Sequence, residues 1–352
     1  MNMQITNDDL AQAEIVGYTR QGKPVFSIAG GAPTVANVQN WIPIEYDSDV
    51  VQRVQMESAV ERWARRYPMR TSTREIPRSA GMTVNADTTY ADDASTNDKV
   101  TITARRFVAR FSIEEDDLAD ANSRMDVIAA KGVDWAISYA DTFDNACLGV
   151  TGAESSTPAN HRPFTSLYKA LRTTDGSIYT ADTNYSSWNG TTIRIAANPD
   201  GTSCYEKLSS TFGLVEKGKY WSPADMMVWA HPSWRGVLRL TLDGNGAPIF
   251  EESAYIDSQT QRPVDTLFGT RIAWSRGAKT TSAGCTDSPD GNALLYYVNT
   301  RYLARGDRSG PETLTDNARA QDDTDAYSVK FRTRRGFKIN HQLSAAVCEK
   351  LA

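Results

Sequence analysis

The chain has 352 residues, of which 40% are hydrophobic and 23% are charged. It can therefore bury a substantial core, which excludes a fully disordered chain, a collagen and a disulfide-stapled miniprotein. The 38 basic and 43 acidic residues give a formal net charge of -5, which argues against a dedicated DNA or RNA clamp.

Targeting and metal-binding signals are weak. No run of about 18 apolar residues predicts a transmembrane helix. The N-terminal residues are acidic and polar, without the basic and apolar regions of a signal peptide. The cysteines lack the CxxC spacing of a zinc site, which indicates reduced thiols in a cytosolic compartment. They are Cys147, Cys204, Cys285 and Cys348.

The N-terminal part predicts an arm followed by a helix. Residues 1–47 mix Gly, Pro and isolated apolar side chains without a helical period, which favours an extended arm. The arm is either a frayed terminus or a segment that docks on a neighbouring subunit, and Phe26 and Trp41 are costly to leave in water. Residues 49–66 carry an apolar stripe at helical spacing and end before Pro68, so they predict a helix.

Residues 70–112 predict a long two-stranded hairpin. The stretches RTSTREIPRS and VTITARRFVARFSI alternate apolar and polar side chains, as β-strands do, and a polar, acidic tip lies between them. An isolated two-stranded ribbon is marginally stable in water. We therefore expect this hairpin to lie against another surface.

Residues 123–148 predict a long helix. Apolar residues recur at steps of three and four, Ser123 can cap the first turn, and Gly149 can terminate the last one. At about 1.5 Å per residue, the segment Arg124–Leu148 is about 37 Å long. A helix of this length with one apolar face is expected to act as a spine, with Trp135 packed in the core.

The remaining sequence predicts an insertion, an α/β unit and closing strands. Residues 150–202 are rich in Ser, Thr, Asn and Gly, which indicates a surface-exposed insertion with a short helix at 164–172. Residues 203–305 alternate helical and strand patterns around the buried strand ADMMVWA. Residues 320–352 alternate apolar and polar side chains, which predicts a hairpin turning at Arg335-Gly336 and then a strand or short helix.

The sequence contains no complete motif for catalysis or metal binding among those we considered. No Walker A motif, GxSxG elbow or HExxH motif occurs. The turn that begins at Asp243 resembles the start of a calcium loop, but Ala247 and Ala254 stand where oxygen ligands are needed. His231 follows a predicted strand, and no motif places a nucleophile or carboxylate beside it. We expect no catalytic, cofactor-binding or metal-binding residues and no enzymatic activity.

Charge is distributed unevenly along the chain. Six arginines fall within residues 62–78 and four more lie between 319 and 335, whereas residues 85–98 hold four aspartates and no basic residue. A basic surface that receives the acidic tip of a neighbouring copy explains both patches. The candidate intersubunit residues are Arg74, Arg78, Asp87, Tyr90, Asp92, Asp93, Asp98, Arg332, Arg334 and Arg335.

The order of these parts resembles the tailed-phage major capsid protein of the HK-97 fold. The segment ITARRFVARFSIEEDDLADANSRMDVIAAKGVDWAISYADTFDNACLG looks like the returning arm of that family's extended loop and its spine helix. The segment MMVWAHPSWRGVLRLTLDGNGAPIF is similar to the strand, helix and turn of the axial domain, and LFGTRIAWS and RGFKINHQLSAAV resemble later strands. The likeness spans about residues 40–352.

The resemblance implies an α+β chain divided as in the HK-97 fold. The implied parts are an N-terminal arm (1–47), a peripheral-domain helix (48–69), an extended β-hairpin loop (70–112), the spine helix of the peripheral domain (113–150), a surface insertion (151–202), an axial α/β domain (203–318) and peripheral-domain return strands (319–352).

The resemblance also implies a structural role. Copies in this family form hexamers and pentamers of an icosahedral shell that encloses the double-stranded DNA of a tailed bacteriophage, and each extended loop lies across an adjacent subunit. The implied location is the virion, after assembly in the host bacterial cytoplasm, without a membrane. The implied partners are a portal protein and, in some members, a separate scaffolding protein, a maturation protease and a decoration protein. The DNA would be enclosed without sequence-specific binding.

One family feature is not expected here, and two alternatives stay open. Some members crosslink subunits through a lysine of the extended loop, but Lys99, the one lysine in this loop, lies near its base. We therefore do not predict that crosslink. The alternatives are an encapsulin-type nanocompartment shell, which shares the fold, and an enzyme with its site in residues 203–305.

Overall fold

The computed structural model divides the chain into two compact units, Met1–Val50 and Val51–Ala352. The structure describes residues 13–18, 24–28, 56–79, 81–82, 84, 86, 92, 97–114, 127–156, 161–172, 184–188, 203–243, 245–257, 263–282, 284–317 and 326–351. Among these residues, no helix is both long enough and apolar enough to cross a membrane.

The first unit contains a β-hairpin. β1 (Ala13–Tyr18) pairs with β2 (Pro24–Ile28) in antiparallel register. The apolar and β-branched residues of β1 favour a strand. The expectation of an extended arm over residues 1–47 did not include this hairpin. Trp41 lies outside the described residues.

The second unit contains a seven-stranded mixed sheet with helices on both faces. Its strands, in spatial order, are β7 (Tyr185–Trp188), β15 (Ala345–Lys350), β12 (Ala293–Asn299), β8 (Met226–Ala230), β11 (Thr270–Trp274), β10 (Pro263–Leu267) and β9 (Phe250–Ile256). The helices are α5 (Val127–Leu148), α6 (Leu167–Arg172), α7 (Cys204–Glu216) and α8 (Trp234–Leu240). β8 and β12 are buried throughout, as strands covered on both faces should be. Val228 packs with α7 and α8, whereas Trp229 packs with α5 and α6.

The expected surface insertion contributes to this core. Leu167 and Leu171 of α6 are fully buried, and β7 pairs with β15 in parallel. The prediction of a surface-exposed insertion over 151–202 is therefore wrong for α6 and β7. The short helix predicted at 164–172 is confirmed from Leu167 onward. A few apolar residues within a Ser- and Thr-rich segment were enough to bury it.

The last described strand also joins this sheet. β15 lies between β7 and β12 and pairs with β12 in antiparallel register. Residues 319–352 were expected to return together to the peripheral domain. The structure divides them instead, because the fully buried residues Ala345–Cys348 complete the seven-stranded sheet.

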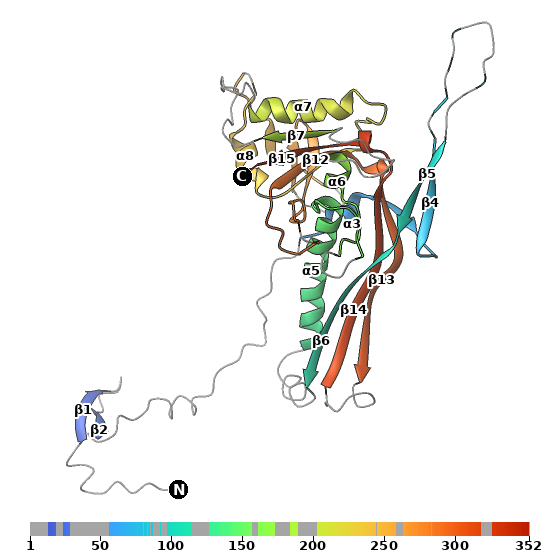
Figure 1. Ribbon diagram of the computed structural model, residues 1–352. Helices are drawn as coiled ribbons and strands as arrows, with labels where there is room; N and C mark the ends of the chain where they lie inside the picture. Colours follow the sequence, from blue (N-terminus) through green and yellow to red (C-terminus); the bar gives the residue numbers. More distant parts are fainter. Residues whose placement is uncertain are drawn as a thin grey trace. The chain divides into compact units, whose positions relative to one another are not determined.

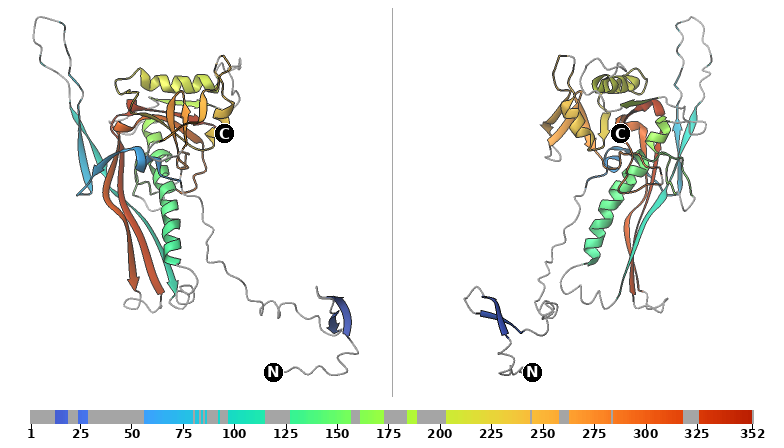
Figure 2. Two further views of the ribbon diagram at one scale, coloured as in Figure 1. Left: turned by 180° about the vertical axis from the view of Figure 1, so that it is seen from behind. Right: turned by 60° about the vertical axis from the view of Figure 1, so that its left-hand side comes forward.

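A second sheet has four strands, three of them long. In spatial order they are β3 (Arg65–Pro68), β13 (Leu303–Asn317), β14 (Ala326–Ile339) and β6 (Arg105–Glu114). α5 lies beside the long strands in every view (Figure 1 and Figure 2). Trp135 of α5 stacks on Phe331 of β14 with ring centroids 5.5 Å apart, and Phe107 of β6 meets Phe143 edge-on at 5.6 Å. The predicted spine helix is confirmed from Val127 onward. Ser123, its predicted N-terminal cap, lies outside the described residues.

The predicted turn at Arg335-Gly336 is wrong. β14 runs through this point and pairs with β13 on both sides of it. This position of the strand requires a glycine because another strand of the chain approaches its Cα closely and leaves no room for a Cβ. β13 lies wholly within the residues expected to form the axial domain (203–318), but it belongs to the same four-stranded sheet as β14. Alternate apolar residues of β14 are buried, as predicted: Val329, Phe331, Phe337 and Ile339.

The helix predicted over 49–66 is shorter in the described residues. It is α3 (Ala59–Trp63), which begins after Ser58, whose hydroxyl accepts a hydrogen bond from the backbone N–H of Glu61 at 3.0 Å. Arg65–Pro68 form β3 instead, which pairs with β13 in parallel. This pairing satisfies the backbone groups that a longer helix would have used internally.

The predicted hairpin forms, and its base rests on its own chain. β4 (Thr73–Arg78) and β5 (Asp98–Thr103) pair in antiparallel register, and we call this pair with its tip the ribbon. Val100 and Ile102 are buried, whereas Met82 and Val84 toward the tip are 76% and 88% exposed. β6 was expected to continue the hairpin, but it leaves the ribbon and joins the four-stranded sheet.

Candidate functional site

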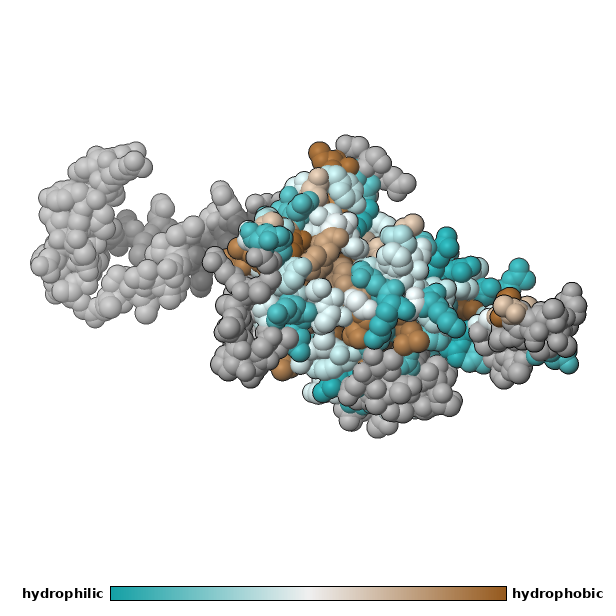
Figure 3. All heavy atoms as spheres, turned by 90° about the horizontal axis from the view of Figure 1, so that it is seen from above, coloured by the Kyte–Doolittle hydropathy of each residue, from teal (hydrophilic) through white to brown (hydrophobic). Residues whose placement is uncertain are grey.

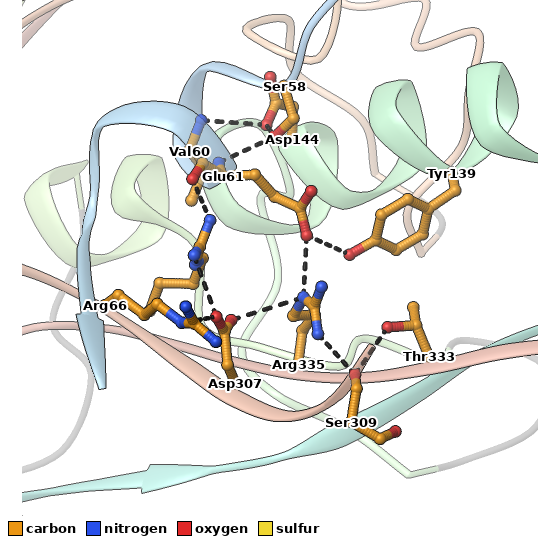
Figure 4. Close-up of polar contacts among 11 residues, drawn as sticks. Ser58, Val60, Glu61, Arg66, Tyr139, Asp144, Asp307, Ser309, Thr333 and Arg335 are labelled. Carbon is orange, nitrogen blue, oxygen red and sulfur yellow. Dashed lines mark hydrogen bonds and ion pairs between the residues drawn. The ribbon is translucent and has the colours of Figure 1, made fainter. Parts of the chain in front are cut away.

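A buried polar network joins α3, α5, β13 and β14 (Figure 4). The Glu61 carboxylate accepts hydrogen bonds from Tyr139 Oη and Arg335 Nε, both at 2.8 Å. Arg335 also donates to the Ser309 carbonyl at 2.5 Å and lies 3.5 Å from Asp307. Burial and the adjacent Glu61 carboxylate raise the pKa of Tyr139, so its phenol stays protonated and donates.

Asp307 extends this network to the edge of the sheet. Its carboxylate lies 2.5 Å from Arg66 and 3.0 Å from Arg305. Arg305 also donates to the carbonyl of Glu61. The charged groups that belong to this network each face an opposite charge, so the network holds α3 on the sheet rather than offering a free acid or base.

Asp144 of α5 fixes the start of α3. Its buried carboxylate accepts hydrogen bonds from Ala59 N at 2.9 Å, Val60 N at 3.3 Å and the Ser58 hydroxyl. The Ser275 hydroxyl donates to it at 2.5 Å. Burial raises the pKa of Asp144 to about 6, and these hydrogen bonds oppose the rise. Asp144 therefore links three segments that are distant in sequence.

The residues considered for chemistry have structural roles. His231 Nδ1 lies 2.8 Å from the Ser233 hydroxyl, and burial lowers the pKa of His231 to about 4, so its ring is neutral at pH 7. The Asp243 carboxylate accepts from Asn245 N at 2.9 Å and Ala247 N at 2.7 Å, which confirms the predicted turn. Within the described part of the chain, no group of three or more His, Cys, Asp or Glu side chains could hold a metal ion.

A hollow of about 280 Å³ lies between α3 and strands β10 and β11. Trp63 forms part of its wall, with the guanidinium groups of Arg62 and Arg271 at 5.0 and 4.5 Å from its ring. On the opposite wall, Asp265 accepts from Trp274 Nε1 at 2.9 Å. These are cation–π and hydrogen-bonded pairs, not a nucleophile beside a base.

The predicted residues at the base of the ribbon are bound within the chain. Arg78 Nε donates to Asp98 at 2.6 Å, and Arg78 Nη1 donates to the Asn340 carbonyl at 2.8 Å. The Arg78 guanidinium lowers the pKa of Asp98. Arg74 lies 5.4 Å from the Tyr67 ring. These contacts hold the ribbon to its own subunit, and the intersubunit role expected of Arg74, Arg78 and Asp98 stays a prediction.

The predicted tip residues are only partly described. Asp92 is exposed, toward the end of the ribbon. Asp87, Tyr90 and Asp93 lie outside the described residues. The acidic tip therefore remains a prediction from the sequence, carried here by Asp92 alone.

The face of the four-stranded sheet turned away from α5 is strongly basic. Phe107 and Phe331 point toward α5, and successive side chains of a strand alternate between faces. The strand register then places Arg106 of β6 opposite Arg334 of β14, and Arg110 opposite Lys330. We call the five cations on this side the basic face: Arg106, Arg110, Lys330, Arg332 and Arg334.

Among the described residues, two arginines of the basic face form no ion pair. Arg332 pairs with Glu312 at 2.6 Å. For Arg106 and Arg334, no ion pair is formed with any other described residue, and Arg334 Nε is buried without a hydrogen-bond partner. Like charges directly opposite each other destabilise a sheet. This face therefore favours an anionic partner.

The structure separates the C-terminal arginines that were predicted as one surface. Arg332 and Arg334 lie on the basic face, whereas Arg335 is 9% exposed and points into the buried network. A surface role for Arg335 is therefore corrected. The sequence analysis did not predict Arg106 and Arg110. The alternation along their strand could have identified them, because each directly precedes a phenylalanine, Phe107 or Phe111, and so lies on the opposite face.

Comparison with solved structures identifies the fold. The capsid of a native GTA particle, computed with C5 symmetry, superposes with a TM-score of 0.60 at 13% identity and covers 92% of this chain and 100% of that chain. A structure from Gordonia phage Cozz has a TM-score of 0.62 at 11% identity, with 93% and 97% covered. The mature capsid of bacteriophage PhiM1 has a TM-score of 0.57 at 13% identity, with 88% and 92% covered.

The comparisons confirm the predicted fold class. The chain has the mixed α+β fold of phage capsid structures, to which the resemblance to the HK-97 fold pointed. No protein-family model and no curated protein matches the sequence. Identities of 11–15% to the solved structures carry the fold alone.

Proposed function

We propose that this protein is the major capsid protein of a tailed bacteriophage. It would assemble as hexamers and pentamers into an icosahedral shell that encloses double-stranded DNA. The likeness of fold to capsid structures over most of the chain carries the proposal. A structural rather than enzymatic role follows from it, and the local hydrogen bonds of the candidate groups His231 and Asp243 support that role.

The exposed features of the subunit support assembly. The ribbon presents Met82 and Val84 to solvent, and the basic face keeps like charges side by side. On the face shown in Figure 3, the coloured hydrophobic residues form separate small patches among hydrophilic ones. Contacts through extended segments and charge fit this distribution better than one broad apolar interface.

The contact between neighbours follows from these charges. The acidic ribbon tip, with Asp87, Tyr90, Asp92 and Asp93, would bind the basic face of the next subunit. Carboxylates placed between Arg106 and Arg334 would remove the like-charge repulsion and supply a partner for Arg334 Nε. This refines the candidate set by replacing Arg335 with the two arginines of β6.

The proposal also covers location and partners. The protein would reside in the virion after assembly in the host bacterial cytoplasm. A portal protein is expected, and a scaffolding protein, a protease or a decoration protein would act where assembly needs one. DNA would be enclosed without sequence-specific binding, consistent with the net charge of -5.

The test is expression of the full chain alone, followed by size-exclusion chromatography and negative-stain electron microscopy. Closed shells or rings of five and six subunits are expected, and co-expression with a portal should yield shells that retain DNA. Monomers that stay monomeric under crowding and with phage assembly partners would contradict the proposal. Small shells that enclose an enzyme rather than DNA would favour the encapsulin-type alternative.

A further inference from the structure

Two glycines stand opposite each other in the four-stranded sheet. The register of β13 and β14 pairs Gly306 with Gly336. A Cβ on Gly336 would lie 2.6 Å from Ile102 Cγ2 and 3.1 Å from the carbonyl oxygen of Thr103. A Cβ on Gly306 would lie 3.1 Å from the same Ile102 methyl and would clash with Met69 Sδ. The space above this glycine pair is therefore filled by Ile102 of the ribbon, with Met69 beside it over Gly306.

Ile102 is the side chain that lies over both glycines. Its side chain is 0% exposed, and with Met69 and Ala304 it forms a small core separate from the two main ones. Tyr67 and Ile76 pack around it. This small core contains residues from the ribbon and from the sheet, so it is the place where the ribbon is joined to the body. We call Ile102, Met69, Ala304, Gly306 and Gly336 the ribbon seat.

The ribbon has a second attachment beyond the seat. Ile102 pairs with Arg74 across the ribbon, and Arg78 pairs with Asp98, four residues further along. At Arg78 the guanidinium donates to the Asn340 carbonyl, which follows the end of β14. At about 3.3 Å per residue, the two attachments are about 13 Å apart. Two separated attachments fix the direction of the ribbon as well as its position.

The need for glycine here is a matter of space. Backbone conformation does not explain it, because the described glycines with positive φ are Gly81, Gly246, Gly269 and Gly284. Gly310, in the same strand as Gly306, provides the contrast, because a Cβ added there would meet nothing within 4 Å. The clash at Gly336 involves the rigid branch of an isoleucine and a backbone oxygen, whereas at Gly306 it involves mainly the flexible end of a methionine.

We infer that Gly336, with Gly306, is a positioning site that sets the course of the ribbon in the free subunit. The tip would then reach a neighbour already oriented, so less conformational entropy is lost on association. The ordering of the ribbon rests on the contacts above alone. Only its consequence for assembly rests on the proposed function.

The test measures the ribbon in unassembled full-length subunits. Spin labels on Thr101→Cys in the ribbon and Ser209→Cys in α7, both exposed positions, report the distance distribution between ribbon and body. Cys285, the one cysteine that is not fully buried, is replaced by Ser. The distance distribution should broaden most in Gly336→Ala and less in Gly306→Ala, and it should keep its wild-type width in Gly310→Ala. Gly336→Ala should about double the width of the distribution.

Removing the isoleucine gives an independent variant. Ile102→Ala introduces no clash and should also broaden the distance distribution. If Gly336→Ala does not fold, Ile102→Ala alone tests whether the seat orders the ribbon. In the double variant Gly336→Ala/Ile102→Ala, the added methyl no longer meets Ile102 Cγ2, its nearest contact, so the melting temperature should exceed that of Gly336→Ala alone. A distribution as narrow as wild type in Ile102→Ala, or additive losses in the double variant, would overturn the inference.

Assembly is measured separately on the same variants. Shell yield should fall about ten-fold or more in Gly336→Ala and Ile102→Ala and stay unchanged in Gly310→Ala. Wild-type shell yield in the two seat variants, despite a broadened ribbon, would overturn the role in assembly. If wild-type protein forms no shells even under crowding and with phage assembly partners, but the seat variants still broaden the distribution, the proposed function fails and the ribbon seat stands.

Discussion

At the scale of single residues, the buried charges are arranged as links between elements. Glu61, Asp144 and Asp307 each bind groups from at least two other segments. A buried charge is tolerated only when it is paired and hydrogen-bonded. Removing one partner should therefore cost more stability than removing an exposed pair on the other face of the same sheet.

Arg335 provides a direct test of this rule. Arg335→Met leaves the carboxylates of Glu61 and Asp307 without their shared partner, and breaking a buried pair costs about 3–5 kcal/mol. The free energy of unfolding, measured with denaturant, should fall by about 3 kcal/mol. Arg332→Met, three positions earlier on the exposed face, is the control and should have little effect. Equal losses in both variants would contradict the inward placement of Arg335.

Asp144 predicts a pH dependence with a defined sign. Its pKa in the folded chain is raised to about 6 by burial, so the folded state binds this proton more readily than the unfolded state does. The contribution of Asp144 to stability is therefore greatest below its ordinary pKa and is lost as the pH rises through 6. The difference between the two pKa values corresponds to about 3 kcal/mol.

The measurement compares unfolding free energies of wild type and Asp144→Asn between pH 4 and pH 8. In the difference between the two free energies, the contributions of the other titrating groups cancel. Wild type should gain relative to the variant as the pH falls from 7 to 4. A difference that does not change with pH, or that changes in the opposite direction, would show that the hydrogen bonds to Asp144 outweigh its burial.

At the scale of elements, α5 carries the body of the second unit. It packs on the four-stranded sheet through Trp135 and Phe143, and Leu148 lies in the same core as Trp229 of the seven-stranded sheet. Truncating a fully buried aromatic costs about 3–5 kcal/mol. Trp135 is only partly buried, so Trp135→Ala should cost about 2 kcal/mol.

The melting temperature of Trp135→Ala measures this cost. Val133→Ala, on the exposed side of the same helix at 43% exposure, is the matched control, and its free energy of unfolding should stay within about 0.5 kcal/mol of wild type. A melting temperature equal to wild type for Trp135→Ala would mean that the stack on Phe331 contributes nothing.

Alternation and helical periodicity predicted most of these elements correctly. The buried strand at 226–230, the long helix and the ribbon all have strong local patterns. The errors lie where pairing with a distant strand decides the structure. Arg65–Pro68 form a strand because they pair with β13. Gly336 lies in a strand because it pairs with Gly306, and Ile102 occupies the space that a Cβ at position 336 would need. No local pattern contains either partner.

The candidate interface divides in the same way. Arg332 and Arg334 were predicted because they cluster in sequence, and the parity of their strand separates them from Arg335. Arg106 joins them only through the register between β6 and β14. The sequence shows the charge of each strand residue, but only the pairing between strands shows which charged residues lie side by side on one face.

At the scale of the whole molecule, the charges predict how copies meet. Arg106→Glu with Arg334→Glu reverses the basic face, and Asp92→Lys with Asp93→Lys reverses the tip. Each pair should reduce shell yield by about ten-fold or more without lowering the melting temperature of the free subunit. Particle yield after size-exclusion chromatography is the measurement.

Combining the two reversals tests the partnership. The four-residue exchange restores opposite charges and should recover much of the shell yield. Arg301→Glu, an exposed arginine away from the basic face, is the control and should assemble normally. Unchanged yield after reversal of Asp92 and Asp93 would contradict the docking of the tip.

The position of β15 has a consequence for the order of events during synthesis. β7, β8 and β12 are all translated before β15, yet β15 lies between β7 and β12. Until residues 345–350 have emerged from the ribosome, the edge of β12 is open and its apolar side chains lack one neighbour. The seven-stranded sheet therefore closes late, and a nascent chain on the ribosome lacks the finished surface that a neighbouring copy would have to recognise.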